Sequence, residues 1–199
     1  MKKNLGLLAG VLLLLSACAP AAAPSPTPTL RSPSPAITTV PTIPATPTRS
    51  PCPSPAATQA QQVVIELAKG GTITIALRPD KAPNTVRVFL AKVNACFYDG
   101  LAFHRVVPNF VIQGGDPLGS GTGGGTQPTE LSDLPFVKGA VGIARGGDIK
   151  VSNDSQFFAC IGECRHLDGQ YTNFGQVVAG QEVADRVQVG DRIKSIRAK

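Results

Sequence analysis

Residues 103–116 read Phe-His-Arg-Val-Val-Pro-Asn-Phe-Val-Ile-Gln-Gly-Gly-Asp. Two short apolar runs, 102–107 and 110–113, lie on either side of a Pro-Asn pair, and a Gly-Gly pair follows the second run. Short apolar runs bounded by Pro, Asn and Gly are typical of β-strands joined by turns. The stretch therefore predicts two adjacent short strands.

The strand pattern continues on both sides of this stretch. Toward the N-terminus, alternating apolar residues at 63–67 and 73–77 flank Gly70-Gly71, which predicts a β-hairpin. Toward the C-terminus, further apolar runs lie at 139–144, 156–160, 173–178 and 191–197.

Helical spacing is confined to two places. Pro83 suits a first helical turn, and the apolar residues after it predict a helix over 83–95. A second short helix fits residues 181–187. Because strands do not alternate regularly with helices, the pattern favours a mainly β fold, a closed antiparallel barrel with two helices, over a parallel sheet.

The N-terminus is typical of an export signal. Lys2 and Lys3 precede an apolar stretch from Leu5 to Leu15, which is shorter than the ~20 residues of a spanning helix. The stretch ends in Leu-Ser-Ala-Cys18, which resembles the bacterial lipobox, whose cysteine carries diacylglycerol. We therefore expect a signal peptide over 1–17 and an exported protein, anchored through lipid on Cys18 to the outer face of the membrane. The alternative is an ordinary secretory signal with Cys18 there by chance.

The segment 18–61 is interpreted as a disordered tether. Twelve of the eighteen prolines lie between Pro20 and Pro55, interleaved with Ser, Thr and Ala. Such a composition buries little apolar surface and favours extended polyproline conformations. A spacer is expected, with a mucin-like or partner-binding tract as the alternative. The folded domain is then 62–199.

The charge of the domain excludes one class of partner. Residues 62–199 contain fifteen Lys or Arg and thirteen Asp or Glu, a net charge of +2. The basic residues are scattered, so we expect no nucleic-acid partner.

The stretch 103–116 resembles the signature of the cyclophilins. Three further blocks of that family occur in the expected order, at 121–124, at 142–145 followed by 155–158, and at 167–169 followed by Phe174-Gly175. The resemblance covers about Val63 to Ile196. It implies a closed eight-stranded antiparallel barrel capped by two helices, and a peptidyl-prolyl cis/trans isomerase that needs no cofactor or metal. We expect a monomer whose substrates are proline-containing segments of exported proteins.

The resemblance also assigns the site. It implies Arg105, Gln113 and Phe110 as catalytic residues, with Arg105 donating toward the prolyl nitrogen and Gln113 holding the arginine. His104 is expected to support the strand around Arg105. The residues implied in substrate binding are Val111, Ala144, Arg145, Gln156, Phe158, His166, Leu167 and Tyr171.

Three features depart from the family pattern. His166 stands where many eukaryotic cyclophilins have a tryptophan that improves cyclosporin binding, so we expect weak cyclosporin binding. Tyr171 stands where those proteins have a site histidine. The segment 146–154 is unlike the family's asparagine-rich run, which leaves the preference for residues beyond proline open.

Four cysteines besides Cys18 leave several pairings open. Cys160 and Cys164 are close enough to close a small loop as a disulfide, but Cys96 could compete for either, and Cys52 is the fourth. Alternatively, Cys160, Cys164 and His166 could form half of a metal site, although no second Cys/His pair exists.

Other function classes have weaker support. The run 119–125 is glycine-rich, but it lacks the Lys-Ser/Thr of a phosphate-binding loop. Neither histidine lies in a hydrolase nucleophile motif. The main alternative to the enzyme is a cyclophilin-like module that binds proline segments without isomerising them.

Overall fold

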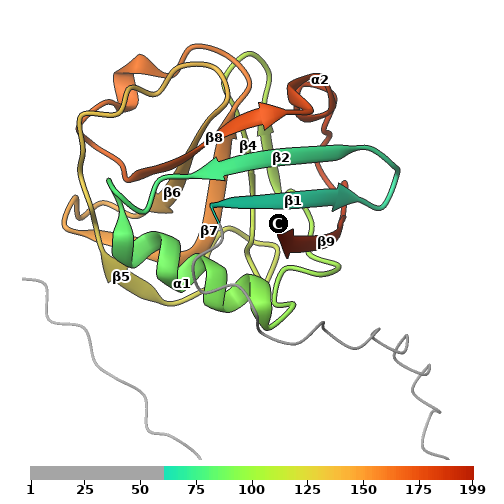
Figure 1. Ribbon diagram of the computed structural model, residues 1–199, viewed down its shortest axis with the longest axis horizontal. Coiled ribbons are helices and arrows are strands. Elements are labelled where there is room, and N and C mark those ends of the chain that lie inside the picture. Colours follow the sequence, from blue (N-terminus) through green and yellow to red (C-terminus); the bar gives the residue numbers. More distant parts are fainter. Residues whose placement is uncertain (1–60) are drawn as a thin grey trace, which may run out of the picture. The chain divides into compact units, whose positions relative to one another are not determined.

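The computed structural model describes residues 61–199 (Figure 1). The predicted signal peptide over 1–17, the lipidated Cys18, the tether up to residue 60 and Cys52 lie outside the described residues. The predictions that concern them therefore remain predictions.

The described residues form one antiparallel sheet. Its main path has the order β3-β4-β7-β6-β8-β2-β1-β9, and β5 pairs with β7 beside that path. The strands are β1 (Gln62–Leu67), β2 (Thr72–Leu77), β3 (Arg105–Val107), β4 (Val111–Gly114), β5 (Thr126–Pro128), β6 (Ala140–Arg145), β7 (Val151–Cys160), β8 (Asn173–Ala179) and β9 (Ile193–Ala198).

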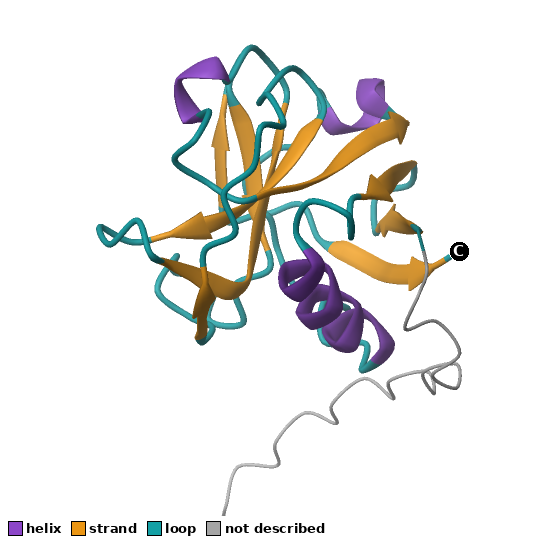
Figure 2. Cartoon of the chain, turned by 60° about the vertical axis from the view of Figure 1, so that its left-hand side comes forward, coloured by secondary structure: helices purple, strands orange, loops and turns teal. Residues whose placement is uncertain are grey.

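The sheet is strongly curled, as Figures 1 and 2 show. The eight strands of the main path and two α-helices agree with the prediction, but closure is not confirmed, because no ladder between the described residues joins β3 to β9. The chain segments that precede these two strands do meet, through a bridge between Ala102 and Arg192.

Two α-helices and a short 3₁₀ helix flank the sheet. Helix α1 (Pro83–Asn94) begins at a proline, as predicted, and buries Val86, Phe89, Leu90 and Val93 against the sheet. Helix α2 covers only Gln181–Ala184, and η1 covers Arg165–Leu167. In Figures 1 and 2, α1 lies on the lower side of the sheet and the two short helices lie on the upper side.

The main core fills the inside of the curl. Alternating residues of the hairpin β1–β2 point inward, and Phe89 of α1 packs against the rings of Tyr98, Phe157 and Phe174 at centroid distances of 5.1–5.7 Å. A helix and strands far apart in sequence therefore share one aromatic core.

A second, smaller apolar cluster lies apart from the main core. It contains Val111, Phe136, Ala140, Phe158, Cys160 and Cys164, with Phe110, Leu167 and Tyr171 packed against it. Strand alternation explains the division, since successive side chains point to opposite faces. On β4, Ile112 joins the main core and Val111 joins the second cluster.

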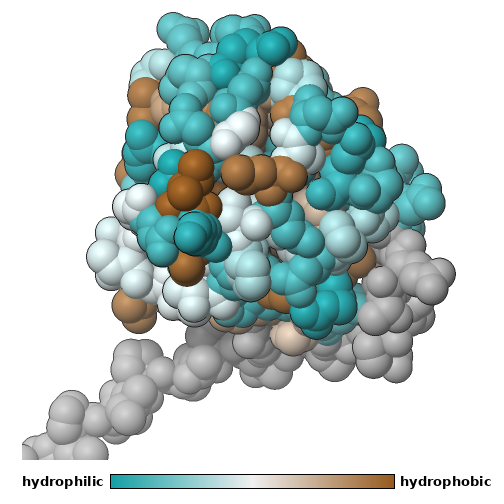
Figure 3. All heavy atoms as spheres, turned by 90° about the vertical axis from the view of Figure 1, so that its left-hand side faces the viewer, coloured by the Kyte–Doolittle hydropathy of each residue, from teal (hydrophilic) through white to brown (hydrophobic). Residues whose placement is uncertain are grey.

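The face of the domain shown in Figure 3 is largely polar. On the face shown in Figure 3, apolar residues occur in separated groups among hydrophilic ones. In the described part of the chain, none of the helices has the length and apolar character needed to span a membrane.

Candidate active site

Three neighbouring strands place the main predicted residues in one row. Arg105 on β3 is opposite Gln113 on β4, and Gln113 is opposite Phe158 on β7. Directly opposed residues in adjacent strands have side chains on the same face, about 5 Å apart. The register therefore brings together a guanidinium, an amide and an aromatic ring.

The row opens into a cavity of about 260 Å³. Nine of the eleven residues that the sequence predicted for catalysis or substrate binding line it, namely Arg105, Phe110, Val111, Gln113, Ala144, Arg145, Phe158, Leu167 and Tyr171. The two exceptions are Gln156, which lines the adjacent cavity, and His166, whose ring stacks on Phe110 with centroids 4.9 Å apart. We refer to this cavity as the proline pocket, after the ligand that the resemblance of the sequence implies.

Aromatic contacts shape the floor and the rim of the proline pocket. Phe158 stacks on Phe136 at 5.6 Å and meets Tyr171 edge-on at 5.8 Å. Behind it, Gly142 leaves the space that the Phe158 ring occupies, since a Cβ there would lie 2.4 Å from Phe158 Cζ. Aromatic rings therefore form part of the lining of the pocket.

Arg105 is exposed and oriented by an amide. Its Nη1 donates to Gln113 Oε1 at 3.3 Å, which leaves the other guanidinium donors available to a ligand. Arg145 lies across the pocket, with its guanidinium carbon 4.4 Å from the centre of the Tyr171 ring and its Nε donating to Gln170 O at 2.8 Å. Among the described residues, the two charged side chains that line the pocket are both cationic, and none of the lining residues is a carboxylate.

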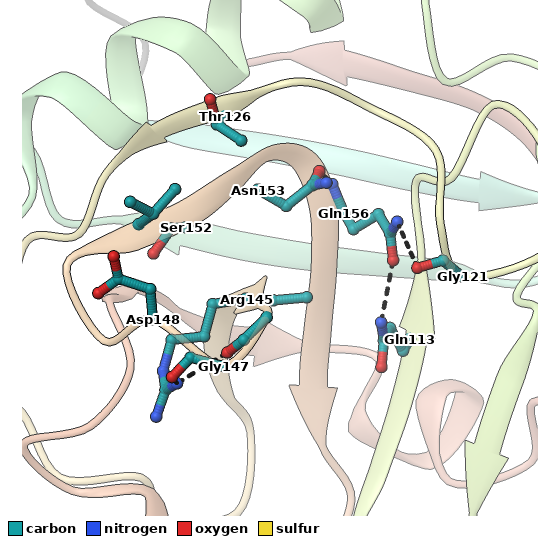
Figure 4. A pocket seen from close by; sticks show the side chains of 12 residues that line it. Gln113, Gly121, Thr126, Arg145, Gly147, Asp148, Ser152, Asn153 and Gln156 are labelled. Carbon is teal, nitrogen blue, oxygen red and sulfur yellow. Dashed lines mark hydrogen bonds between the residues drawn. The ribbon is translucent and has the colours of Figure 1, made fainter.

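A second cavity of about 360 Å³ adjoins the proline pocket and shares Gln113, Ala144 and Arg145 with it. Figure 4 shows that Gln156 lies between Gln113 and Gly121. Gly121 belongs to the glycine-rich run 119–125, which we call the glycine loop. Gln113 Nε2 donates to Gln156 Oε1 at 3.1 Å, and Gln156 Nε2 donates to the carbonyl oxygens of Gly121 and Gly123. Gln156 therefore links the residue that holds Arg105 to this loop.

Most of the other residues that line the second cavity were not predicted. They come from β5 and from the segment between Arg145 and Gln156, and they include Thr126, Gly146, Gly147, Asp148, Val151, Ser152 and Asn153. The only signal in the sequence was that 146–154 differs from the run expected there.

His104 and Asp116 support the site from behind. Both ring nitrogens of His104 are buried without a hydrogen-bond partner among the described residues, and burial lowers its pKa despite the opposing effect of Asp116. Burial alone would raise the pKa of Asp116, but N–H donors of the glycine loop, such as Leu118 at 2.8 Å, outweigh it and lower the pKa. The buried ring nitrogens of His104 fit the supporting role predicted for it.

The structure joins Cys160 and Cys164 in a disulfide. It thereby selects one of the pairings that the sequence left open. Because both sulfurs are used, these two residues are not available as thiolate ligands, which removes the metal alternative.

The comparisons with known proteins agree on one family. The family model described as "Cyclophilin type peptidyl-prolyl cis-trans isomerase/CLD" matches residues 62–198. The chain is 41% identical over 140 residues to a peptidyl-prolyl cis-trans isomerase of Synechococcus elongatus, an alignment that covers 68% of this chain and 94% of that protein. It is 42% identical over 137 residues to peptidyl-prolyl cis-trans isomerase B of Bacillus subtilis, with 67% and 94% covered.

Solved structures show the same likeness. A cyclophilin-type peptidyl-prolyl cis-trans isomerase of Cryptosporidium parvum superposes with a TM-score of 0.65 at 27% identity, covering 70% of this chain and 98% of that one. The same protein in the presence of the dipeptide Ala-Pro gives a TM-score of 0.65 at 26% identity, with 70% and 99% covered.

Proposed function

The chain belongs to the cyclophilin-type peptidyl-prolyl cis-trans isomerase family and is a peptidyl-prolyl isomerase, and we propose that Arg105 is the group that assists the rotation. The observation that carries this proposal is the row of Arg105, Gln113 and Phe158 across three strands, all three of which line one pocket. The Ala-Pro dipeptide used with the Cryptosporidium parvum relative supports X-Pro segments as the substrates.

The chemistry requires no covalent intermediate. Amide resonance sets a barrier of about 18–20 kcal/mol to rotation of an X-Pro bond. As the bond twists, the prolyl nitrogen becomes pyramidal and gains a lone pair that can accept a hydrogen bond. Arg105 can donate to that lone pair, which the planar amide lacks. Its guanidinium therefore stabilises the twisted state more than the ground state.

The other residues of the pocket orient Arg105 or bind the substrate. Gln113 holds Arg105 by the bond at 3.3 Å, so that less freedom is lost when the guanidinium engages the substrate. Phe110, Val111, Phe158 and Leu167 seat the proline ring. Ala144 and Arg145, at the boundary between the two cavities, would contact the residue before proline, with Gln156 beside them.

The location belongs to the proposal as well. The apolar stretch after Lys3 and the Leu-Ser-Ala-Cys18 sequence support export, with a lipid anchor on Cys18. The substrates would then be exported proteins whose slow prolyl steps limit folding near the membrane. We also propose that the protein acts as a monomer. It should bind cyclosporin weakly, since His166 presents a smaller ring than tryptophan on Phe110.

The test is prolyl exchange on a short Ala-Pro peptide, measured by NMR with the purified full chain and three variants. Arg105→Ala should lower kcat/KM by about 10²-fold or more, a typical cost of removing a transition-state donor. Arg105→Lys should remain strongly impaired, because a lysine lacks the planar fork. Arg87→Ala, which removes an exposed arginine of α1, should behave like the wild type.

Two outcomes would contradict the proposal. If the folded Arg105→Ala variant keeps the wild-type rate, Arg105 does not assist the rotation. If the folded wild-type chain binds the peptide but does not accelerate exchange, the proline-binding module becomes the better account.

A further inference from the structure

The Cys160–Cys164 disulfide lies at the base of one wall of the proline pocket. Cys160 ends β7, and Cys164 immediately precedes η1, with Cα atoms 6.4 Å apart. Both residues are fully buried in the second apolar cluster. The bond therefore ties the end of a sheet strand to the start of a segment outside the sheet.

That segment carries two of the predicted binding residues. Leu167 lines the proline pocket, and His166 covers Phe110 with its ring. The sheet ladder fixes Arg105, Gln113 and Phe158, but it does not reach this wall. Contacts other than strand pairing must therefore hold His166 and Leu167 in place.

The segment has little support of its own. Helix η1 has only three residues and no side-chain hydrogen bond at its N-cap, and none of its residues is buried. At its far end, Asp168 accepts hydrogen bonds from Phe136 N at 2.7 Å and from Arg165 Nε at 2.6 Å. At its near end, the covalent link is at Cys164, whose backbone N–H also donates to Phe136 O at 3.0 Å.

The loop between the two cysteines packs tightly against the same strand connection. Ile161 N and Gly162 N both donate to Phe110 O, at 2.8 and 3.3 Å. A Cβ on Gly162 would lie 1.9 Å from Asn109 O, so the backbone approaches that turn closely. Cys164 Sγ also lies 3.4 Å from Phe110 O. A change in the conformation of this loop would therefore alter the contacts of Phe110, which lines the pocket.

We propose that the Cys160–Cys164 disulfide is a positioning element that preorganises the His166–Leu167 wall for the proline ring. The inference rests on the proposed function, because it assigns a role in the same pocket. Without the bond, the wall would have to be ordered when the substrate binds, which weakens binding. The wall contacts the proline ring in both the planar and the twisted states, so its loss should raise KM and leave kcat nearly unchanged.

The proposal also connects the pocket to its compartment. Disulfides persist in oxidising, exported locations and are rare where thiols are kept reduced. The pocket would then reach its full affinity only after export, where its proposed clients fold.

The experiment compares the purified full chain with the double variant Cys160→Ala/Cys164→Ser. Serine at position 164 can donate to Phe110 O and so replaces a polar contact without closing the loop. Prolyl exchange on an Ala-Pro peptide gives kcat and KM, and a separate titration gives Kd for the same peptide. We expect KM and Kd to rise together by about fivefold or more, with kcat within about twofold, since two freed side chains must be ordered on binding.

Two further samples keep the result interpretable. Mild reduction of the wild-type chain tests the same bond if the double variant does not fold, provided that mapping of thiol-labelled peptides shows Cys160 and Cys164 opened and Cys96, which is also disulfide-bonded, still closed. Reoxidation should then restore KM. The control variant Asp99→Asn weakens the ion pair of Asp99 with Arg197, at 2.7 Å and remote from the loop, and should lower stability without raising KM.

Unchanged KM and Kd in a folded protein with an open disulfide would overturn the proposal, as would a loss confined to kcat. Failure of the proposed function is a separate outcome. In that case the oxidised wild type would not accelerate exchange, whereas Kd would still report on the wall.

Discussion

Replacing Gly142 by alanine should disturb the proline pocket from behind. The added Cβ would lie 2.4 Å from Phe158 Cζ and 2.7 Å from Phe136 Cε1, whereas carbon atoms normally meet at about 3.5–4.0 Å. The two rings stack on each other, so they must move together by about 1 Å. Overpacking of this kind typically lowers the free energy of unfolding by about 1–3 kcal/mol.

The same displacement should lower activity, because Phe158 lines the pocket that we propose holds the proline ring. If about 1.4 kcal/mol of the cost falls on the bound state, kcat/KM should fall about tenfold. The assays are urea unfolding for stability and NMR exchange on an Ala-Pro peptide for activity. A double-mutant cycle with Phe158→Leu should show non-additive stability losses, because the smaller side chain relieves the overlap.

A matched glycine provides the control. Gly146 follows the same strand, and a Cβ there would meet no atom within 4 Å, so Gly146→Ala should change stability by less than about 0.5 kcal/mol. If Gly142→Ala is as stable as Gly146→Ala and retains the wild-type kcat/KM, the overlap argument is refuted.

Two further predictions concern stability. Glu130→Ala should lower the free energy of unfolding by about 1–2 kcal/mol in urea titrations, because Glu130 caps α1 by accepting hydrogen bonds from the backbone N–H groups of Asn84 and Thr85 at 3.0 and 2.7 Å. The control Glu182→Ala, at an exposed site, should change this free energy by less than about 0.5 kcal/mol, and equal losses in the two variants would contradict the capping role. Burial lowers the pKa of His104, so the unfolded chain is protonated at higher pH than the folded one, and the free energy of unfolding should fall as the pH drops below about 6.5. In His104→Phe this free energy should depend less on pH between 7 and 5, and an unchanged pH dependence would show that His104 does not cause the loss.

The sequence predicted the elements whose pattern is local. Alternation identified the hairpin that became β1 and β2, and proline placement with helical spacing identified α1 within one residue of its observed end. The prediction of a helix over 181–187 was wrong in length, because helical structure ends at Ala184. Strand β5 reads Thr-Gln-Pro and has no apolar run, so periodicity could not find it.

Strand β7 shows a related limit. Its first half, Val151 to Ser155, is mostly polar and lies outside the predicted apolar run 156–160, yet it pairs with β5 and continues to Cys160. Pairing of such a segment depends on a partner strand rather than on its own composition. Similarly, the capping of α1 by Glu130 joins residues 45 and 46 positions apart, and no local signal indicates it.

The site was more predictable than the loops because its motif specifies residue types at fixed strand positions. Nine predicted residues line one cavity, and the register explains this for Arg105, Gln113 and Phe158. The lining of the second cavity was missed because it depends on the path of the segment after Arg145. The pairing of Cys160 with Cys164 also needed the structure, since spacing alone allowed Cys96 as a competitor.

Strands β4 and β7 contribute to both the core and the site, because the two tasks use opposite faces of the same strands. On β4, Ile112 enters the main core while Gln113 faces the pocket, and on β7 the same division holds for Phe157 and Phe158. A register slip of one residue would bury the polar face and expose the core, so burial of the core also fixes the row of Arg105, Gln113 and Phe158. Leu167 lies in η1, outside this ladder, so strand pairing does not position it. The strand register does not position the His166–Leu167 wall, and this wall follows directly after Cys164, which the disulfide links to the end of β7.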